Sequence, residues 1–227
     1  MNSENVKANE EVIMPFEDTQ QEYYIEDLGK IKRKLFYSFF KRFFDFILSL
    51  VAIIILFIPM IIVGILVKIT SKGPILYKQE RLGKNGKPFK LVKFRSMRVD
   101  AEANGAQWSQ GDNDPRITKF GRIMRKTRID ELPQLFTILT GKMSIVGPRP
   151  EREVFYNEFE KYIHGFNQRL KVKPGLTGLA QVSGGYDLKP EEKIVYDIEY
   201  IKKRSLWLDF KIIIKTVVVI FTHKGAK

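Results

Sequence analysis

The hydrophobic and polar positions along the 227-residue chain divide it into three stretches. Residues 1–30 are polar and acidic without apolar periodicity, and this pattern predicts a flexible tail. Residues 31–70 combine a basic flank with a run of 22 uncharged residues from Phe46 to Val67. Residues 71–227 alternate short apolar runs with polar turns, which is typical of a folded domain.

The uncharged run is long enough for a membrane helix, because 22 residues at about 1.5 Å each extend roughly 33 Å. Basic residues flank both of its ends, which favours a cytoplasmic location for both. Pro59 lies inside the run and is expected to bend or break the helix there. Two interpretations stay open on these grounds: a re-entrant hairpin broken at Pro59, and a kinked helix that spans the membrane.

The third stretch predicts a mainly helical α+β domain. Short runs at 75–77 and 89–94 predict strands, and the turn residues at 83–86 predict that they form a β-hairpin. Residues 100–116 are predicted to form a loop. Helical spacing is present at residues 117–126, 133–139, 153–171 and 191–203. Residues 206–221 are apolar with charges on one side, a pattern that suits a helix lying flat on a membrane.

Composition limits the chemistry. The chain has no cysteine, which excludes disulfides, thiolate metal sites and a cysteine nucleophile. Its two histidines, His164 and His223, are 59 positions apart, so a histidine metal site or a Ser-His triad is disfavoured. The sequence also lacks a Walker A motif, a G-x-S-x-G elbow and an H-E-x-x-H motif. Any catalysis is therefore expected to rest on carboxylates and cations.

Charge is distributed unevenly around a net value of +13. The tail carries eight acidic residues and two lysines, whereas Lys68 to Arg149 contains 18 basic and 7 acidic side chains. This basic stretch predicts an anionic partner: nucleic acid, an acidic lipid surface or a phosphorylated small molecule. Nucleic acid lacks a supporting RNP or zinc-finger signature. A solvated basic face without a ligand is the alternative.

The adjacent carboxylates Asp130 and Glu131 are the sharpest local feature. They stand between a cationic predicted helix and an apolar one that begins at Pro133. Neighbouring carboxylates suit Mg²⁺ bound to phosphate oxygens, and an aspartate can act as a nucleophile at phosphorus. The cations available to hold phosphate are Lys93, Arg95, Arg125 and Arg149. The alternative is structural, with Asp130 capping the following helix and Glu131 complementing its dipole.

Arg149 lies between Pro148 and Pro150, which restrict the backbone on either side and hold the guanidinium group on a stiff segment. Such rigidity suits a binding residue, although a rigid turn with a surface arginine would have the same sequence.

Five motifs in order resemble the bacterial sugar transferase family, the monotopic polyprenyl-phosphate phosphoglycosyl transferases. The resemblance covers about residues 41–221. Its motifs are KFRSM at 93–97, RKTRIDELPQLF at 125–136, GKMSIVGPRP at 141–150, KPGLTGLAQV at 173–182 and LDFK at 208–211.

The resemblance implies transfer of a sugar 1-phosphate from a nucleotide sugar, usually UDP-linked, to undecaprenyl phosphate, with release of UMP. Asp130 falls on the nucleophile of the family, which forms a covalent phosphosugar-aspartate, and Glu131 falls on the Mg²⁺-binding acid. Lys93 and Arg125 fall on phosphate-contacting positions, and Arg149 falls on a nucleotide-contacting position. These enzymes begin the assembly of capsules, exopolysaccharides and other surface glycans.

The resemblance also favours the re-entrant hairpin, with the protein held at the cytoplasmic face of the cell membrane. The sequence departs from many members at Ile58, where they carry serine before the proline. The expected partners are a UDP-sugar, undecaprenyl phosphate and membrane lipid, without nucleic acid. The identity of the sugar and a homo-oligomer stay open. Two other readings remain: a basic, membrane-anchored scaffold without catalysis, and a conventional glycosyltransferase that releases UDP.

Overall fold

In the computed structural model of the chain, residues 21–103, 105, 114–185 and 188–222 are described. Helices predominate, and the described strands form three separate two-stranded sheets. The predicted α+β, mainly helical class agrees with this architecture.

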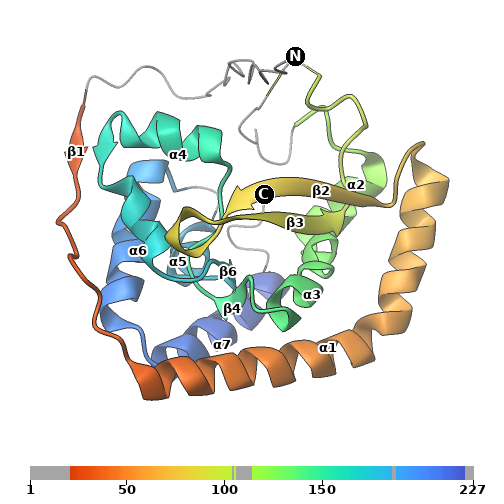
Figure 1. The fold of residues 1–227 in the computed structure, drawn as a ribbon. Helices are drawn as coiled ribbons and strands as arrows, with labels where there is room; N and C mark the ends of the chain where they lie inside the picture. Colours follow the sequence, from red (N-terminus) through yellow and green to blue (C-terminus); the bar gives the residue numbers. More distant parts are fainter. Residues whose placement is uncertain (1–20, 104, 106–113, 186–187, 223–227) are drawn as a thin grey trace, which may run out of the picture.

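One long helix, α1 (Leu35–Thr70), frames the domain on two sides. Figure 1 shows that α1 runs along one edge of the molecule and then turns to follow the adjacent edge. Pro59 is the proline inside this helix, and a proline within a helix is the usual cause of such a bend. The helix is thus bent but continuous, so the structure has the bend and not the break that the sequence also allowed at Pro59.

Only one face of α1 is buried against the domain. Its buried residues are Asp45, Ser49, Ile53, Met60, Val63, Gly64 and Val67. Most of its other apolar side chains are exposed, and α1 is the one helix of the described chain that is long and apolar enough to cross a membrane. A soluble protein rarely exposes so large an apolar surface, so this face indicates association with a membrane.

The predicted hairpin is present as β2 (Leu76–Leu82) and β3 (Pro88–Phe94), joined through the 3₁₀ turn η1 (Lys84–Gly86). The strands are antiparallel and pair Tyr77 with Lys93 and Gln79 with Leu91. Side chains alternate between the faces of a strand, so these four residues lie on one face. Phe94 lies on the opposite face of β3 and is buried, and Phe89 is buried on the same face as Leu91.

Two short helices follow the loop. Helix α2 (Lys119–Lys126) begins after Thr118, whose hydroxyl oxygen accepts a hydrogen bond from the backbone N–H of Gly121. The chain then passes through the 3₁₀ turn η3 (Ile129–Glu131) into α3 (Gln134–Leu139). Both predicted helices are therefore confirmed with shorter bounds. Residues 104 and 106–113 of the predicted loop lie outside the described residues.

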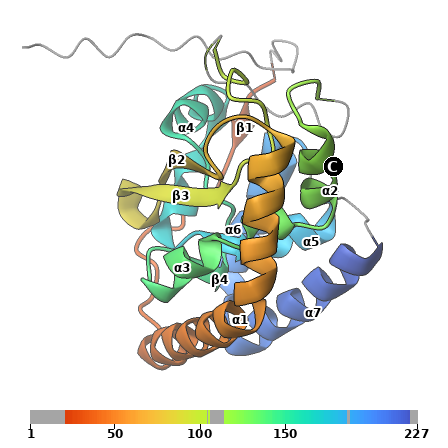
Figure 2. The same cartoon turned by 90° about the vertical axis from the view of Figure 1, so that its right-hand side faces the viewer.

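The rest of the domain is built on a second set of elements. Strand β4 (Ser144–Val146) pairs in parallel with β6 (Gly175–Thr177), and α5 (Leu179–Ser183) follows β6 directly. Helices α6 (Pro190–Lys203) and α7 (Leu206–Thr222) agree with the predicted helical segments. Figure 2 shows α7 beside the first arm of α1.

The single helix predicted over residues 153–171 is wrong. The structure has α4 (Glu153–Glu160), the short strand β5 (Ile163–His164) and the 3₁₀ helix η4 (Phe166–Lys171) instead. Gly165, between β5 and η4, adopts a left-handed conformation with φ of 98°, which a continuous helix could not contain. The Glu160 carboxylate accepts hydrogen bonds from the N–H groups of Gly165 and Asn167, both at 2.8 Å, and stabilises this turn.

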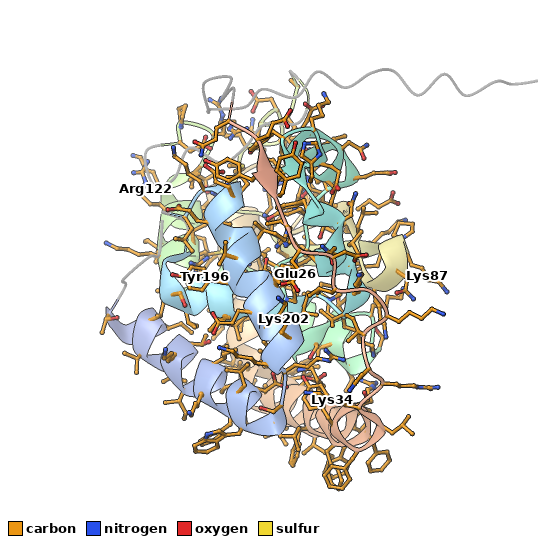
Figure 3. The ribbon with its side chains drawn as sticks, turned by 90° about the vertical axis from the view of Figure 1, so that its left-hand side faces the viewer. Glu26, Lys34, Lys87, Arg122, Tyr196 and Lys202 are labelled. Carbon is orange, nitrogen blue, oxygen red and sulfur yellow. The ribbon has the colours of Figure 1, made fainter. Side chains whose placement is uncertain are left out.

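Part of the predicted flexible tail belongs to the folded domain, and residues 1–20 lie outside the described residues. Strand β1 (Tyr23–Tyr24) pairs in parallel with β5. Figure 3 shows this segment passing over α6, where Lys202 donates a hydrogen bond to the Glu26 carboxylate at 2.5 Å. The segment packs here because Ile25 and Leu28 reach an apolar cluster, which the acidic pattern obscured.

Two hydrophobic clusters organise the molecule. One contains residues of β4, α4, η4, α6 and α7, and the other contains residues of the α1 inner face, β3, α2 and α3. Ile145 of β4 packs against both clusters. The candidate site lies where the elements of the two clusters meet.

Candidate active site

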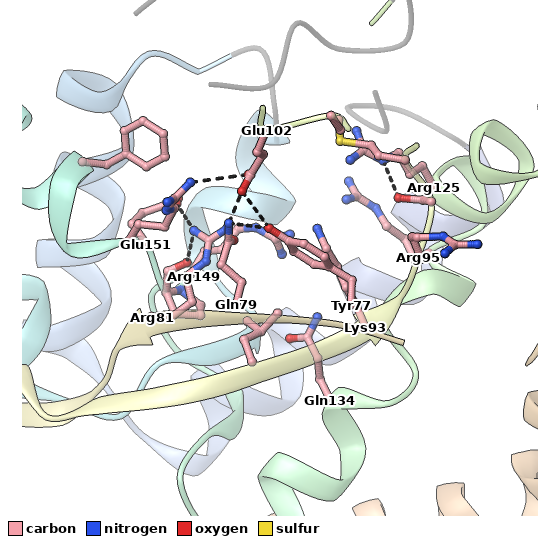
Figure 4. Close-up of a pocket in the computed structure, with 18 of the residues that line it drawn as sticks. Tyr77, Gln79, Arg81, Lys93, Arg95, Glu102, Arg125, Gln134, Arg149 and Glu151 are labelled. Carbon is pink, nitrogen blue, oxygen red and sulfur yellow. Dashed lines mark hydrogen bonds and ion pairs between the residues drawn. The ribbon is translucent and has the colours of Figure 1, made fainter. Parts of the chain in front are cut away.

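A cavity of about 270 Å³ opens over the inner face of the β2–β3 hairpin. Figure 4 shows Tyr77, Gln79 and Lys93 rising from the strands toward it. Its lining is strongly basic, with cations from the hairpin, α2, the segment after β4 and η4. The basic residues are Arg81, Lys93, Arg95, Arg98, Arg116, Arg125, Arg128, Arg149, Arg152, Arg169 and Lys193, and the acidic ones are Glu102, Glu151 and Asp197. An excess of positive charge in a concave site attracts polyanions.

Asp130 and Glu131 lie beside this cavity and are not among its lining residues. They are 4% and 7% exposed, and the cavity-lining cations Lys93 and Arg128 act electrostatically on both of them. Arg128 enters the η3 turn with a positive φ of 58°, an unusual conformation for a residue with a Cβ atom. Such strain is common at functional sites because the surrounding contacts hold it in place.

The two neighbouring carboxyl groups have opposite pKa shifts. Burial is the largest influence on Asp130, and with the charge of Glu131 it raises the pKa of Asp130 to about 6 against the opposing effect of Lys93 and Arg125. Burial is also the largest single influence on Glu131 and acts to raise its pKa, but the charge and hydrogen bonds of Arg149, together with Arg128 and Lys93, outweigh it and lower that pKa to about 2. Glu131 is therefore the carboxylate that stays charged throughout the physiological range.

The Arg149 guanidinium group binds the Glu131 carboxylate through two hydrogen bonds. Its Nη2 donates to Glu131 Oε1 at 2.5 Å, and its Nη1 donates to Oε2 at 3.3 Å. This bidentate geometry joins the segment after β4 to the η3 turn. Pro148 and Pro150, the flanking prolines, are both buried, and Pro150 contributes to the cavity wall.

The backbone of residues 148–150 is fixed at three successive carbonyl groups. The carbonyl of Pro148 accepts from Gly175 N–H, that of Arg149 from Arg169 Nη2, and that of Pro150 from Arg81 Nη1. Arg169 is itself held by a buried ion pair with Asp197 at 2.7 Å. The sequence predicted a stiff segment from the prolines alone and missed these two arginines, because their partners are remote in the sequence.

The helix-capping interpretation of Asp130 is wrong. Helix α3 begins after Pro133 without a hydrogen bond from any capping side chain. Asp130 Oδ1 is buried and has no hydrogen-bond partner among the described residues. A buried carboxylate oxygen without a partner is costly, and it suggests a group that acts on a ligand.

The predicted phosphate-binding cations occupy different environments. Lys93 and Arg125 line the cavity and both influence Asp130 electrostatically, and Arg125 Nε donates to Ser96 Oγ at 3.0 Å. Arg95 also lines the cavity but is 4% exposed, and its Nη2 donates to the carbonyl and hydroxyl oxygens of Ser71 at the end of α1. Phosphate binding by Arg95 stays a prediction.

The acidic residues fit a Mg²⁺ ion that is shared with a substrate. The described residues contain no group of three or more His, Asp or Glu side chains that could hold a metal. Mg²⁺ commonly takes one or two carboxylates and completes its shell with phosphate oxygens and water. The Asp130 oxygen without a partner and the adjacent Glu131 suit such an ion, whereas a site made only of protein ligands does not fit.

Comparison with known proteins agrees with the resemblance of the sequence motifs. The sequence model of the bacterial sugar transferase family matches residues 36–223. The chain is similar to the UDP-N-acetylgalactosamine-undecaprenyl-phosphate N-acetylgalactosaminephosphotransferase of Aeromonas hydrophila, at 42% identity over 203 residues. That match covers 88% of the chain and 48% of the relative.

The names of other relatives contain other sugars. The UDP-glucose:undecaprenyl-phosphate glucose-1-phosphate transferase of Klebsiella pneumoniae is 44% identical over 192 residues, covering 82% of the chain and 41% of that protein. The undecaprenyl-phosphate galactose phosphotransferase of Salmonella typhimurium is 41% identical over 203 residues, covering 83% and 42%. The chain thus spans about half the length of the curated relatives it matches.

Proposed function

Because the chain belongs to the bacterial sugar transferase family, we propose that it transfers a sugar 1-phosphate from a UDP-sugar to undecaprenyl phosphate. The observation that carries the proposal is Asp130, a buried carboxylate with an oxygen that has no partner, beside a cavity lined with cations. The names of the relatives supply the substrate classes, since each couples a sugar phosphate to this lipid phosphate.

In the first step, an oxygen of the Asp130 carboxylate attacks the phosphorus that carries the sugar. The bond from that phosphorus to the bridging oxygen breaks, and the oxygen leaves with its electron pair as part of UMP. The product on the protein is a phosphosugar-aspartate. Deprotonated Asp130 is the reactive form, so a pKa near 6 leaves most molecules ready at neutral pH.

In the second step, an oxygen of undecaprenyl phosphate attacks the same phosphorus. The acyl phosphate bond breaks, the carboxylate of Asp130 is restored, and the sugar leaves on a lipid diphosphate. No net proton transfer is required in either step, which accords with a site that has no histidine among the cavity residues. The exchange is thereby divided into two displacements at one phosphorus atom.

The surrounding cations stabilise the charge that develops during each displacement. Lys93, Arg125 and Arg128 act directly on Asp130, and the low dielectric of a buried site strengthens their effect. Arg149 and the rigid segment from Pro148 to Pro150 are the proposed contacts of the nucleotide. Mg²⁺ held by Glu131 would neutralise the diphosphate of the donor when bound.

The membrane position proposed for this reaction is a re-entrant one at the cytoplasmic face. Both arms of α1 contact the same domain: Arg42 in the first arm reaches α3, and Val67 in the second is buried near the end of the helix. A straight spanning helix would carry one of these arms away from the domain. The bend supports entry and exit through one leaflet, with the cavity near the lipid headgroups.

The decisive experiment measures nucleotide release by the purified full chain with Mg²⁺, undecaprenyl phosphate and each of a panel of UDP-sugars. UMP is the expected product from the cognate donor. Asp130→Asn should reduce its release by at least about 10³-fold, because the nucleophile is lost. Glu160→Gln is the matched control, since it makes the same chemical change at a turn outside the cavity.

Each alternative has its own outcome. Release of UDP would show a conventional glycosyltransferase, and binding of anionic lipid without any nucleotide release would show a scaffold. With the donor alone, the intact mass of the protein should rise by one sugar phosphate in the wild type and not in Asp130→Asn. Wild-type turnover without this adduct would contradict the covalent mechanism.

A further inference from the structure

Two oppositely charged residues, Arg42 and Asp45, lie one turn apart on the first arm of α1 and both reach into the domain. Asp45 is 5% exposed although it stands at the start of an apolar membrane segment. An ionised side chain in such a segment is costly unless it is buried in protein and hydrogen-bonded, so its presence calls for a specific role.

Arg42 holds the end of α3. Its Nη1 donates to the carbonyl of Ile138 at 2.9 Å, and its Nη2 donates to the carbonyl of Leu139 at 2.7 Å. These carbonyls belong to the last turn of the helix, where that of Ile138 also accepts from the backbone N–H of Gly141, and a cation there complements the helix dipole. Gly141, two residues after Leu139, has φ of 81°, and a Cβ atom added to it would crowd the Arg42 guanidinium group.

Asp45 holds β4. Its Oδ1 accepts a hydrogen bond from the backbone N–H of Ile145 at 2.9 Å. Ile145 packs against both hydrophobic clusters and stands four positions before Arg149 in the sequence. Lys173, whose pKa is lowered by burial and by the nearby Arg42, lies close enough to Asp45 to interact with its charge.

These contacts complete a ring through the candidate site. From α1, Arg42 leads to α3, whose chain begins just after Asp130 and Glu131. Glu131 binds Arg149, and the Arg149 segment returns through β4 to Asp45 on α1. Every link is a hydrogen bond or a short run of backbone.

We propose that Arg42 and Asp45 are positioning residues that set the distance between the Asp130–Glu131 turn and the Arg149 segment. The membrane helix would then be a structural part of the catalytic site as well as an anchor. This inference rests on the proposed function for its kinetic test, and a second measurement addresses the positioning itself.

The kinetic test compares Asp45→Leu with Lys41→Gln in the full chain, in the same nanodiscs. Lys41 offers a matched control, because it makes an equally short contact from α1, 2.8 Å to Asp209 of α7, and α7 carries no residue of the ring. Asp45→Leu should lower kcat by about tenfold to a hundredfold, as small misplacements of reacting groups do. Lys41→Gln should stay within about threefold of the wild type, and Asp45→Asn, which keeps an acceptor oxygen, should recover much of kcat.

Hydrogen–deuterium exchange of the same proteins tests the positioning without any substrate. Asp45→Leu should speed exchange in residues 129–131 and 144–150, and Lys41→Gln should not. Equal protection of these segments in both variants, or an equal loss of kcat in both, would overturn the inference. If the two variants exchange as expected but the wild type transfers no sugar phosphate from any donor, the proposed function fails and the inference about positioning stands.

Discussion

Asp130 and Glu131 are adjacent in the sequence, yet their surroundings give them different tasks. Glu131 faces the bidentate Arg149 and keeps its charge, whereas Asp130 has a buried oxygen without a partner and a raised pKa. Pairs of titratable groups whose environments separate their pKa values often divide acid, base or nucleophile roles between them. This division supports the proposed roles of Asp130 as nucleophile and Glu131 as a permanent charge.

The raised pKa of Asp130 predicts an acidic limb in the pH profile of the first step. The ionised nucleophile is lost as pH falls through about 6, so kcat/KM for the donor should decline about tenfold per pH unit below that value. Measuring UMP formation by quenched reactions without the lipid acceptor isolates this step, because the lipid phosphate and its own titration are then absent.

Glu131→Gln tests the cause of that limb. Removing the neighbouring negative charge should lower the pKa of Asp130, so the limb should move to lower pH even though the overall rate falls. An unchanged limb in Glu131→Gln would show that another group controls it.

Local chemistry explains which site residues could be predicted from the sequence. Asp130, Glu131 and the proline-flanked Arg149 stand in compact motifs, so their residue types already suggested phosphate chemistry. Arg169 and Arg81 act on the backbone of residues 148–150 from η4 and β2. Their roles depend on which segments the fold brings together, and a linear pattern does not contain that information.

At the scale of elements, α1 shows how a proline inside an apolar run shapes a helix. Pro59 has no N–H to donate and crowds the preceding turn, so the helix bends while the side chains on its inner face stay buried. The sequence correctly predicted that the helix is perturbed at Pro59. The broken hairpin that the resemblance favoured differs from the structure, because α1 stays helical from Leu35 to Thr70 through the bend.

The proposed re-entrant geometry predicts that both ends of α1 face the same side of the membrane. The chain lacks cysteine, so Lys32→Cys and Lys72→Cys each introduce a single reactive thiol. In inverted membrane vesicles, where the cytoplasmic face is outside, both should react with an impermeant maleimide. Protection of one position and labelling of the other would indicate a spanning helix.

The predicted helix over residues 153–171 failed for a reason that hydrophobic spacing does not report. Its apolar positions suit a helix, but Gly165 takes a left-handed conformation and Glu160 bonds to the N–H groups beyond it. A polar side chain that competes for backbone donors can end a helix within an otherwise helical pattern.

The whole molecule presents an apolar face formed by the first arm of α1 together with α7. Phe36 and Phe39 on α1 and Trp207 and Phe210 on α7 are all more than half exposed. Aromatic rings project from this side of both helices in Figure 3. Sequence periodicity predicted the flat-lying helix, but only the fold shows that it shares a surface with α1.

This face predicts lipid contact by Trp207. The chain has two tryptophans, so Trp108→Phe leaves Trp207 as the only indole. In nanodiscs that contain lipids brominated on the acyl chains, the fluorescence of this variant should be strongly quenched relative to ordinary lipids. Equal emission in both lipids would place the ring outside the bilayer and contradict the shared membrane face.

Under the proposed function, the shared apolar face of α1 and α7 would also determine how each reactant finds the protein. A protein bound to a lipid bilayer meets a lipid acceptor by lateral diffusion in two dimensions, whereas a water-soluble donor reaches it by diffusion in three dimensions. The effective concentration of the acceptor is then its mole fraction in the bilayer, and that of the donor is its bulk molarity. Adding inert lipid would dilute one reactant without changing the other, so the composition of the membrane itself would set the pace of the second step.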